Sequence, residues 1–250
     1  MKRCVCVGRL LAVLAAGLLL SSCQRNAPEV GTADGTAAKD PPMAATSVVG
    51  TSHARHFSLR EGPGFMVLEV DAPQVRAAHS QPADARFLAV LVPRGQAMPA
   101  LPDALREAVI VRTPVQRVAV TSNADERMLT ELGLADRLVA VGGTKSYDDA
   151  VRARTLRKEL GQVGYSWHSP PNLDVLLATR PDVFLLRVWS LDLATSLRRA
   201  NALGVPSLPV LIDAEPTYLG RAEWIKVFGA LTGHLPQAQE RFAAIEREVE

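Results

Sequence analysis

Residues 117–143 read RVAVTSNADERMLTELGLADRLVAVGG, and this stretch decides the fold. The run 117–121 is short, apolar and β-branched, which is typical of a buried strand. Apolar side chains at helical spacing then predict a helix over 123–132, ended by Gly133. A second apolar run over 138–141 predicts the next strand. Strand, helix and strand in this order predict a parallel sheet with right-handed crossovers.

The same alternation of strands and helices continues through residues 144–234. Two more strands are expected over 183–186 and 208–212, and further helices over 146–160, 172–178, 191–203 and 219–232. We therefore expect an α/β ligand-binding lobe over 114–234, with ligand beyond the carboxyl ends of its strands. A last helix begins near Pro236 and has no stop signal before Glu250.

Two segments of different character precede this lobe. Alternating apolar residues flank Gly62-Pro63-Gly64, and with runs at 86–93 and 108–112 they predict a small antiparallel β segment over 56–113. Residues 23–55 are rich in Ala, Gly, Thr, Ser and Pro, which predicts a flexible tether. His53 and His56 form an H-x2-H pair at the end of this tether, and we interpret both as exposed to solvent rather than bound to a metal.

The first 22 residues have the pattern of a secretory signal peptide. Lys2, Arg3 and Arg9 precede an uncharged apolar run over 10–20 that is too short to span a bilayer. The end of this segment, Leu20-Ser21-Ser22-Cys23, resembles the lipobox of bacterial lipoproteins. The resemblance implies cleavage before Cys23, lipidation of its thiol, and an exported protein anchored to the cell membrane or to the periplasmic face of the outer membrane. An ordinary signal peptide followed by an incidental cysteine is the alternative.

Charge and cysteine content exclude several classes of protein. The 28 basic and 26 acidic residues nearly balance, so there is no electrostatic signature of nucleic-acid binding. Of the three cysteines, two lie in the leader and the third is Cys23, which leaves none for disulfides, thiolate metal sites or a nucleophile. Gly142-Gly143-Thr144-Lys145-Ser146 hints at a phosphate-binding loop, but a P-loop has Gly directly before its lysine. We therefore expect no enzymatic activity and no metal site.

The ordered set of motifs resembles the class III substrate-binding proteins of ABC importers, which serve ferric siderophores, haem and cobalamin. The resemblance covers roughly residues 57–250, and rests on the opening run together with VGYSWHSPPNLDVLLATRPDVFLL (163–186), LGVPSLPVL (203–211) and AEPTYLGRAEWIKVFGALTG (214–233). It implies two α/β lobes joined by a long helix, with ligand in a cleft between them. Residues 235–250 match the start of that interlobe helix, so the expectation is an N-terminal lobe without its partner, either as a fragment or as a truncated product.

The function implied by the resemblance is capture of an iron complex and its delivery to an ABC permease and its ATPase by a monomeric, membrane-anchored protein. No cofactor is expected apart from the ligand, and the choice among a ferric siderophore, haem and cobalamin stays open. Two other classes also stay open: an exported α/β enzyme without a recognisable catalytic motif, and an interaction lipoprotein with no role in transport.

Residues that follow the predicted strands are the candidate ligand contacts. Aromatic side chains that would wall an apolar cleft are Tyr147, Tyr165, Trp167, Trp189 and Tyr218. Polar candidates are Asn123, Lys145, His168, Arg187 and Arg221, of which the three cations would neutralise an anionic chelate. Some of the aromatic residues could instead pack against the sheet, His168 could simply face solvent, and Arg221 could pair with Glu215 or Glu223. We expect Trp224, on a helix stripe, to belong to the core.

The resemblance also implies a contact with the permease. In the family, an acidic residue after an Asn-Leu pair meets an arginine of the permease, and here the match is Asp174 in Asn172-Leu173-Asp174. The alternative is that Asp174 only places charge in the first turn of the helix opened at Asn172.

Overall fold

The computed structural model describes residues 48–71, 86–189 and 195–249. The predicted signal peptide, the lipidation site at Cys23, most of the predicted tether and the first residues of the helix expected over 191–203 lie outside these ranges. Within the described ranges, no helix combines the length and the apolar character needed to cross a bilayer.

The first sheet contains five strands that are neighbours in chain order. They are β1 (Val48–Val49), β2 (Phe57–Gly62), β3 (Phe65–Asp71), β4 (Arg86–Pro93) and β5 (Val109–Thr113). The pairs β2–β3 and β3–β4 are antiparallel, as the sequence predicts, and β1, within the predicted tether, pairs antiparallel with β2. Strand β5 instead runs parallel to β4. The reason is the long connection after β4, which contains the 3-10 helix η2 (Asp103–Leu105) and returns the chain before β5 begins.

The second sheet is fully parallel and confirms the predicted α/β lobe. Its strands are β6 (Val118–Val120), β7 (Leu138–Val141), β8 (Gly161–Gln162), β9 (Val183–Arg187) and β10 (Ser207–Val210), in the order β10-β9-β6-β7-β8. The chain moves outward from β6 through β7 to β8 and then returns to the other side of β6. The carboxyl ends of β6 and β9 therefore form a topological switch point, where ligands of open α/β sheets bind.

Three of the helices that follow these strands begin at polar caps. The helices of this part of the chain are α1 (Asn123–Glu131), α2 (Asp149–Leu156), α3 (Leu173–Thr179) and α4 (Thr195–Ala202), with the 3-10 helices η3 (Ala135–Arg137) and η5 (Ile212–Ala214). Ser122, Asp148 and Asn172 each accept a hydrogen bond from a backbone N–H in the first turn. Helix α2 is shorter than the expected 146–160, because the Asp148 cap delays its start and the positive φ of Lys158 follows its end.

Three helices close the described chain: α5 (Tyr218–Glu223), α6 (Ile225–Thr232) and α7 (Leu235–Val249). The single helix expected over 219–232 is therefore two helices that meet at Trp224. The Trp224 N–H donates to the carbonyl of Arg221, and the Val227 N–H donates to the carbonyl of Trp224. Both hydrogen bonds join residues three apart, as in the tighter 3-10 helix. The Trp224 side chain is fully buried and donates from Nε1 to Glu215 at 3.0 Å, which confirms its predicted place in the core.

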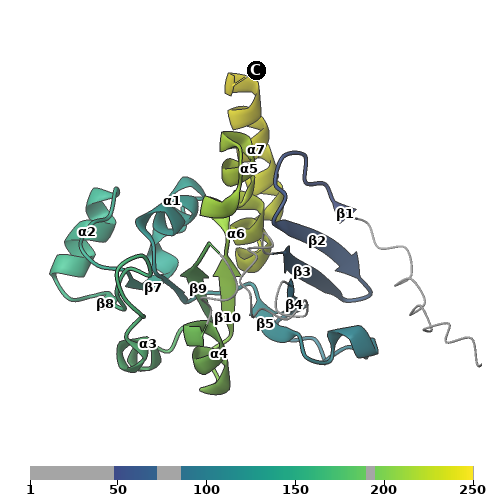
Figure 1. Cartoon of the computed structure of the whole chain (residues 1–250), viewed down its shortest axis with the longest axis horizontal. Coiled ribbons are helices and arrows are strands. Elements are labelled where there is room, and N and C mark those ends of the chain that lie inside the picture. The colour runs from purple at the N-terminus through teal and green to yellow at the C-terminus, as the bar shows by residue number, and fades with distance from the viewer. Residues whose placement is uncertain (1–47, 72–85, 190–194, 250) are drawn as a thin grey trace, which may run out of the picture. The chain divides into compact units, whose positions relative to one another are not determined.

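A single hydrophobic cluster joins the two sheets. Leu59 and Val70 from the first sheet belong to the same buried cluster as Val118, Phe184 and Phe228. Helix α6 contacts β5, α1 and α7, and Figure 1 shows it between the first sheet and α1. The β segment over 56–113 is thus packed onto the α/β lobe and shares its core.

The prediction of a flexible tether up to residue 55 is wrong for residues 48–55. The backbone N–H groups of Ser52, His53 and Ala54 donate to the carboxylate of Glu223 at 2.7–2.8 Å. Lys226 Nζ lies 2.6 Å from the same carboxylate and donates to the Gly50 carbonyl at 2.8 Å. A buried carboxylate requires hydrogen-bond donors, and this segment supplies them.

The next two residues of this segment bind a second buried carboxylate. The N–H groups of Arg55 and His56 donate to the carboxylate of Glu215 at 2.9–3.1 Å. His53 Nε2 lies 2.7 Å from Glu246 on α7, so His53 is in contact with protein rather than fully exposed as expected. Two buried acidic residues therefore fix residues 50–56 against the helices that close the lobe.

Candidate functional site

The ring of Tyr165 packs directly against the backbone of Gly142 and Gly143. A Cβ atom on Gly142 would lie 2.3 Å from Tyr165 Cδ1, and one on Gly143 would lie 3.0 Å from Cε2. The backbone N–H of Lys145 donates to the Tyr165 hydroxyl at 2.7 Å. The stretch that hints at a phosphate loop thus holds an aromatic side chain at the carboxyl end of β7.

Five of the predicted site residues, Tyr165 among them, form one cluster beside Gly142 and Gly143. The ring centroids of Tyr165 and Trp167 are stacked 5.5 Å apart, and His168 meets Trp167 edge-on at 5.9 Å. Lys145 Nζ lies 5.1 Å from the centre of the Trp167 ring, a cation–π distance. Asn123 Nδ2 donates to the Lys145 carbonyl at 3.0 Å, which ties the loop to α1. We call these five residues the aromatic cluster.

A hollow of about 240 Å³ adjoins the aromatic cluster. It is lined by Ser166, Trp167, His168, Ser169, Pro170, Pro171, Leu186, Arg187, Val188, Trp189 and Ser196. Trp167 and Trp189 are each about half exposed, at 50% and 48%. Indole rings and prolines with hydroxyl groups among them suit a ligand that is largely apolar and carries a few polar atoms.

Arg187 reaches the hollow, but its charge is already paired. The guanidinium lies 2.5 Å from Asp125 on α1 and 2.9 Å from Asp213 in η5, and the side chain is 5% exposed. The Arg187 backbone N–H donates to Thr121 Oγ1 at 3.0 Å. The expectation that Arg187 offers a free positive charge to an anionic ligand does not fit these contacts. Its guanidinium instead joins the carboxyl end of β9 to α1 and η5, the elements that follow β6 and β10, at the switch point.

Three predicted residues lie apart from the contacts of the aromatic cluster. Tyr147 and Tyr218 are exposed, at 68% and 66%, the first in the loop after Lys145 and the second at the start of α5. Arg221 Nε donates to the backbone carbonyl of Glu215 at 3.1 Å, not to a carboxylate as the alternative had it. Helix α5 packs on η5 and α7. A ligand-binding role for these three residues stays a prediction.

Sequence reasoning missed two acidic residues in the first turn of α1. Asp125 is fully buried against Arg187, and Glu126 is 1% exposed. Burial raises the pKa of Glu126 to about 7; the neighbouring Ser146 opposes the shift, and the charges of Asp125 and Asp148 add to it. The burial of Asp125 could have been predicted from the sequence, because Asp125 precedes Leu129 by four residues and therefore lies on the apolar face of the helix.

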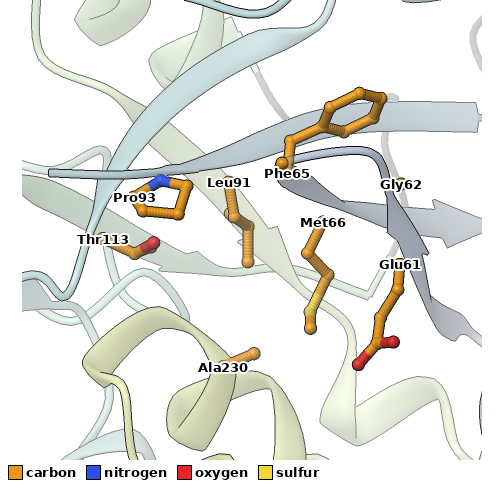
Figure 2. A pocket seen from close by; sticks show the side chains of 9 residues that line it. Glu61, Gly62, Phe65, Met66, Leu91, Pro93, Thr113 and Ala230 are labelled. Atoms are coloured by element: carbon orange, nitrogen blue, oxygen red, sulfur yellow. The ribbon is translucent and has the colours of Figure 1, made fainter. Parts of the chain in front are cut away.

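A second hollow, of about 290 Å³, lies between the first sheet and α6 (Figure 2). Figure 2 shows Met66 and Leu91 directed toward Ala230, with the carboxylate of Glu61 at one side. None of the predicted site residues lines this hollow. Across the described ranges, no three His, Cys, Asp or Glu side chains gather in a way that would hold a metal ion.

No protein-family model matches this sequence, and no curated protein matches it. Among solved structures, the chain is similar to a periplasmic heme-binding protein from Pseudomonas aeruginosa, with 22% identity over 53% of this chain and 44% of that one, at a TM-score of 0.44. A petrobactin-binding protein from Bacillus subtilis gives 15% identity, coverage of 55% and 45%, and a TM-score of 0.44.

A protein of an Fe3+-hydroxamate ABC transport system from Saccharomonospora viridis gives 23% identity, coverage of 54% and 49%, and a TM-score of 0.43. The chain thus spans just under half the length of each of these three structures. These three neighbours are thus described as a heme-binding protein, a petrobactin-binding protein and part of an Fe3+-hydroxamate transport system, and each similarity covers just over half of this chain.

Proposed function

We propose that this protein is the membrane-anchored substrate-binding component of an ABC importer and that it captures a metal chelate of the siderophore or haem type. The observation that carries the proposal is the aromatic cluster beside a hollow at the carboxyl ends of parallel strands. The ordered sequence motifs over residues 117–233, which resemble class III binding proteins, supply the class of function.

The chemistry of the cluster favours a bulky, partly apolar anion. The exposed faces of Trp167 and Trp189 offer area for a chelate or a macrocycle. Lys145 is exposed beside Trp167 and supplies the positive charge that Arg187, paired with two carboxylates, does not. His168 stands at the rim of the hollow, where an imidazole can bind a polar group of a chelate or the iron of haem.

Tryptophan fluorescence tests this proposal directly, because two of the three tryptophans line the hollow. We would titrate the full chain with ferrioxamine B, hemin and cyanocobalamin, and identify any ligand that co-purifies by mass spectrometry. Saturable quenching by one probe is expected, with affinity reduced about tenfold or more in Trp167→Ala and Trp189→Ala. Met98→Ala, an exposed apolar residue away from the hollow, is the control. Absence of saturable quenching by all three probes would overturn the proposal.

The lipid anchor is a separate part of the proposal and rests on Cys23. Cys23→Ala is expected to abolish incorporation of radiolabelled fatty acid and to leave the protein unprocessed or released from the membrane fraction, because the acylated thiol is lost. Cys6→Ala, which changes a leader cysteine, is the matched control. Fatty acid on the Cys23→Ala protein would show that the lipobox interpretation is wrong.

A further inference from the structure

One row of side chains crosses the inner face of the first sheet and ends in a carboxylate. Glu61 of β2 lies opposite Met66 of β3, and Met66 lies opposite Leu91 of β4. Side chains that oppose each other on neighbouring strands point to the same face of a sheet. Figure 2 shows these three on the side of the sheet that faces α6. The row therefore places two apolar side chains and one negative charge opposite this helix.

Small residues account for the space between this row and α6. Helix α6 places Ala230 there, and the hairpin of β2 and β3 contributes Gly62 and Gly64. Apart from its chain neighbours, a Cβ on Gly64 would meet only Gln96 Oε1 within 4 Å, at 3.7 Å. The result is the hollow of about 290 Å³, which is larger than the one beside the aromatic cluster. Its size approaches that of small-molecule sites, which begin at about 300 Å³.

Glu61 is the one charged residue among the described residues that line this hollow. It is exposed and forms no ion pair within the described part of the chain. Arg60, its neighbour on β2, points to the opposite face and binds Glu69. Arg94, just after β4, lies 2.7 Å from Asp182. A carboxylate beside an apolar surface, with these cations paired elsewhere, is complementary to a ligand that brings its own positive charge.

We propose that this hollow is a second ligand site, separate from the aromatic cluster, for a compact apolar molecule that carries one positively charged group. The apolar part of the ligand contacts Met66, Leu91 and Ala230, and its cation lies beside Glu61. The thioether of Met66 is flexible and adapts to ligands of different shape. The proposed capture of a metal chelate does not require this site, so each can be tested without the other.

Three matched probes measure the contribution of charge by itself. 1-Adamantylammonium, 1-adamantanol and 1-adamantanecarboxylate share one rigid apolar cage and differ in their charge near pH 7. Burial of the cage favours binding of all three, whereas an ion pair with Glu61 favours only the first. Because Glu61 is exposed, we expect the ammonium to bind about two- to fivefold more tightly than the alcohol. The carboxylate should bind most weakly, since its charge repels that of Glu61.

The methyl group of Met66 reports on the hollow directly. The full chain labelled with 13C at its methionine methyl groups gives a Met66 signal, which is identified from its loss in Met66→Leu. We expect this signal to shift saturably with 1-adamantylammonium, while that of the exposed Met98 stays still. Ala230→Leu fills the hollow from α6 and should weaken binding of all three probes about tenfold or more. Ala178→Leu, at an exposed position of α3, is the matched control.

Glu61→Gln removes the charge and keeps the shape of the side chain. The ammonium and the alcohol should bind this variant equally, with the affinity for the alcohol as in the parent, because only the ion pair is lost. Glu107→Gln changes an exposed carboxylate outside the hollow and should keep the preference of the parent. If Ala230→Leu fails to fold, the ratio of the two affinities in Glu61→Gln decides alone.

The inference is overturned if no probe shifts the Met66 signal, if the shift persists unchanged in a folded Ala230→Leu, or if the parent binds the ammonium no better than the alcohol. The last result would leave Glu61 as an inward charge that keeps other strands from β2 beyond its pairing with β1. A Met66 signal that depends on protein concentration, and that no probe shifts, would assign the hollow to a second copy of the chain. Tryptophan quenching by ferrioxamine B, hemin and cyanocobalamin in Ala230→Leu should match the parent, so failure of either proposal is recognised separately.

Discussion

At the level of single residues, the site depends on positions where the size or charge of one group is constrained. Gly142 is such a position, because the ring of Tyr165 occupies the space in which any other residue would place its Cβ. Glu126 is another, because its carboxyl group is enclosed without a partner among the described residues. Neither constraint can be seen in the identity of the residue alone.

Gly142→Ala should displace Tyr165. The new Cβ would lie 2.3 Å from the ring, so the ring must move, and the overlap should cost about 1–3 kcal/mol of stability. The stacked Trp167 should change its fluorescence in the same variant. Gly50→Ala is the control, since a Cβ there meets no atom within 4 Å. Unchanged stability and emission in Gly142→Ala would contradict the described packing.

Glu126 also predicts how stability depends on pH. A carboxyl group whose pKa rises from 4.5 to about 7 on folding stabilises the folded state fully below pH 4.5, and this contribution is lost as pH rises toward 7. The difference amounts to roughly 3 kcal/mol. Glu126→Gln should therefore match the parent near pH 4 and exceed it by about 2–3 kcal/mol at pH 8 in urea unfolding. A gap that is the same at both values of pH would count against the shifted pKa.

At the level of elements, the closing helices hold the segment that leads into the first sheet. Glu223, at the end of α5, accepts three backbone N–H groups and the ammonium group of Lys226. Burial alone would raise the pKa of Glu223, but Lys226 and these N–H groups lower it. Its stabilising contribution is therefore present above the ordinary glutamate pKa and is lost as pH falls through the lowered value.

Glu223→Gln should weaken the attachment of residues 52–54 to the closing helices. The amide of the variant places an NH2 group among N–H donors and leaves Lys226 without its carboxylate partner, which should cost about 3 kcal/mol at pH 7. Urea unfolding measures the loss, and amide hydrogen exchange should show reduced protection at Ser52, His53 and Ala54. Glu240→Gln, on the exposed side of α7, should behave like the parent. Full protection of the three amides in Glu223→Gln would show that other contacts hold the segment.

At the level of the whole molecule, the proposed function requires a surface for the permease that is separate from the ligand site. Asp174 is exposed in the first turn of α3, and its side chain forms no ion pair within the described part of the chain. Asn172 caps the same helix through its own side chain, so Asp174 is available for contact with a partner. Its place in the Asn-Leu-Asp stretch is what the family resemblance assigns to docking.

Asp174→Lys should leave ligand affinity nearly unchanged and reduce stimulation of the transporter ATPase in proteoliposomes, because the new charge repels an arginine of the permease. Asp174→Ala should have a smaller effect in the same direction. Asp149→Lys reverses an exposed charge at the start of another helix and serves as the control. Equal stimulation by Asp174→Lys and the parent would place docking elsewhere.

Local sequence was sufficient for most elements of the α/β lobe, although not for the two-residue strand β8, and for much of its aromatic cluster. Apolar runs and helical spacing depend on neighbouring residues, so strands such as β4 and β7 were predicted with the bounds they have in the structure. Parallel strands end at one edge of a sheet, which is why Tyr165, Trp167, His168 and Lys145 could be expected to meet. The break at Trp224 could not be predicted in this way, because it depends on a core built by distant segments.

The remaining features arise from contacts between residues that are far apart in the chain. Residues 48–55 have the composition of a tether, yet Glu223 and Glu215 bind their backbone from 171 and 160 residues away. Arg187 is a cation at a strand end in the sequence, and folding places it between Asp125 and Asp213. Burial and charge pairing depend on which segments pack together. Composition and periodicity therefore could not reveal the binding of residues 52–56 by two glutamates, the paired Arg187 or the enclosed Glu126.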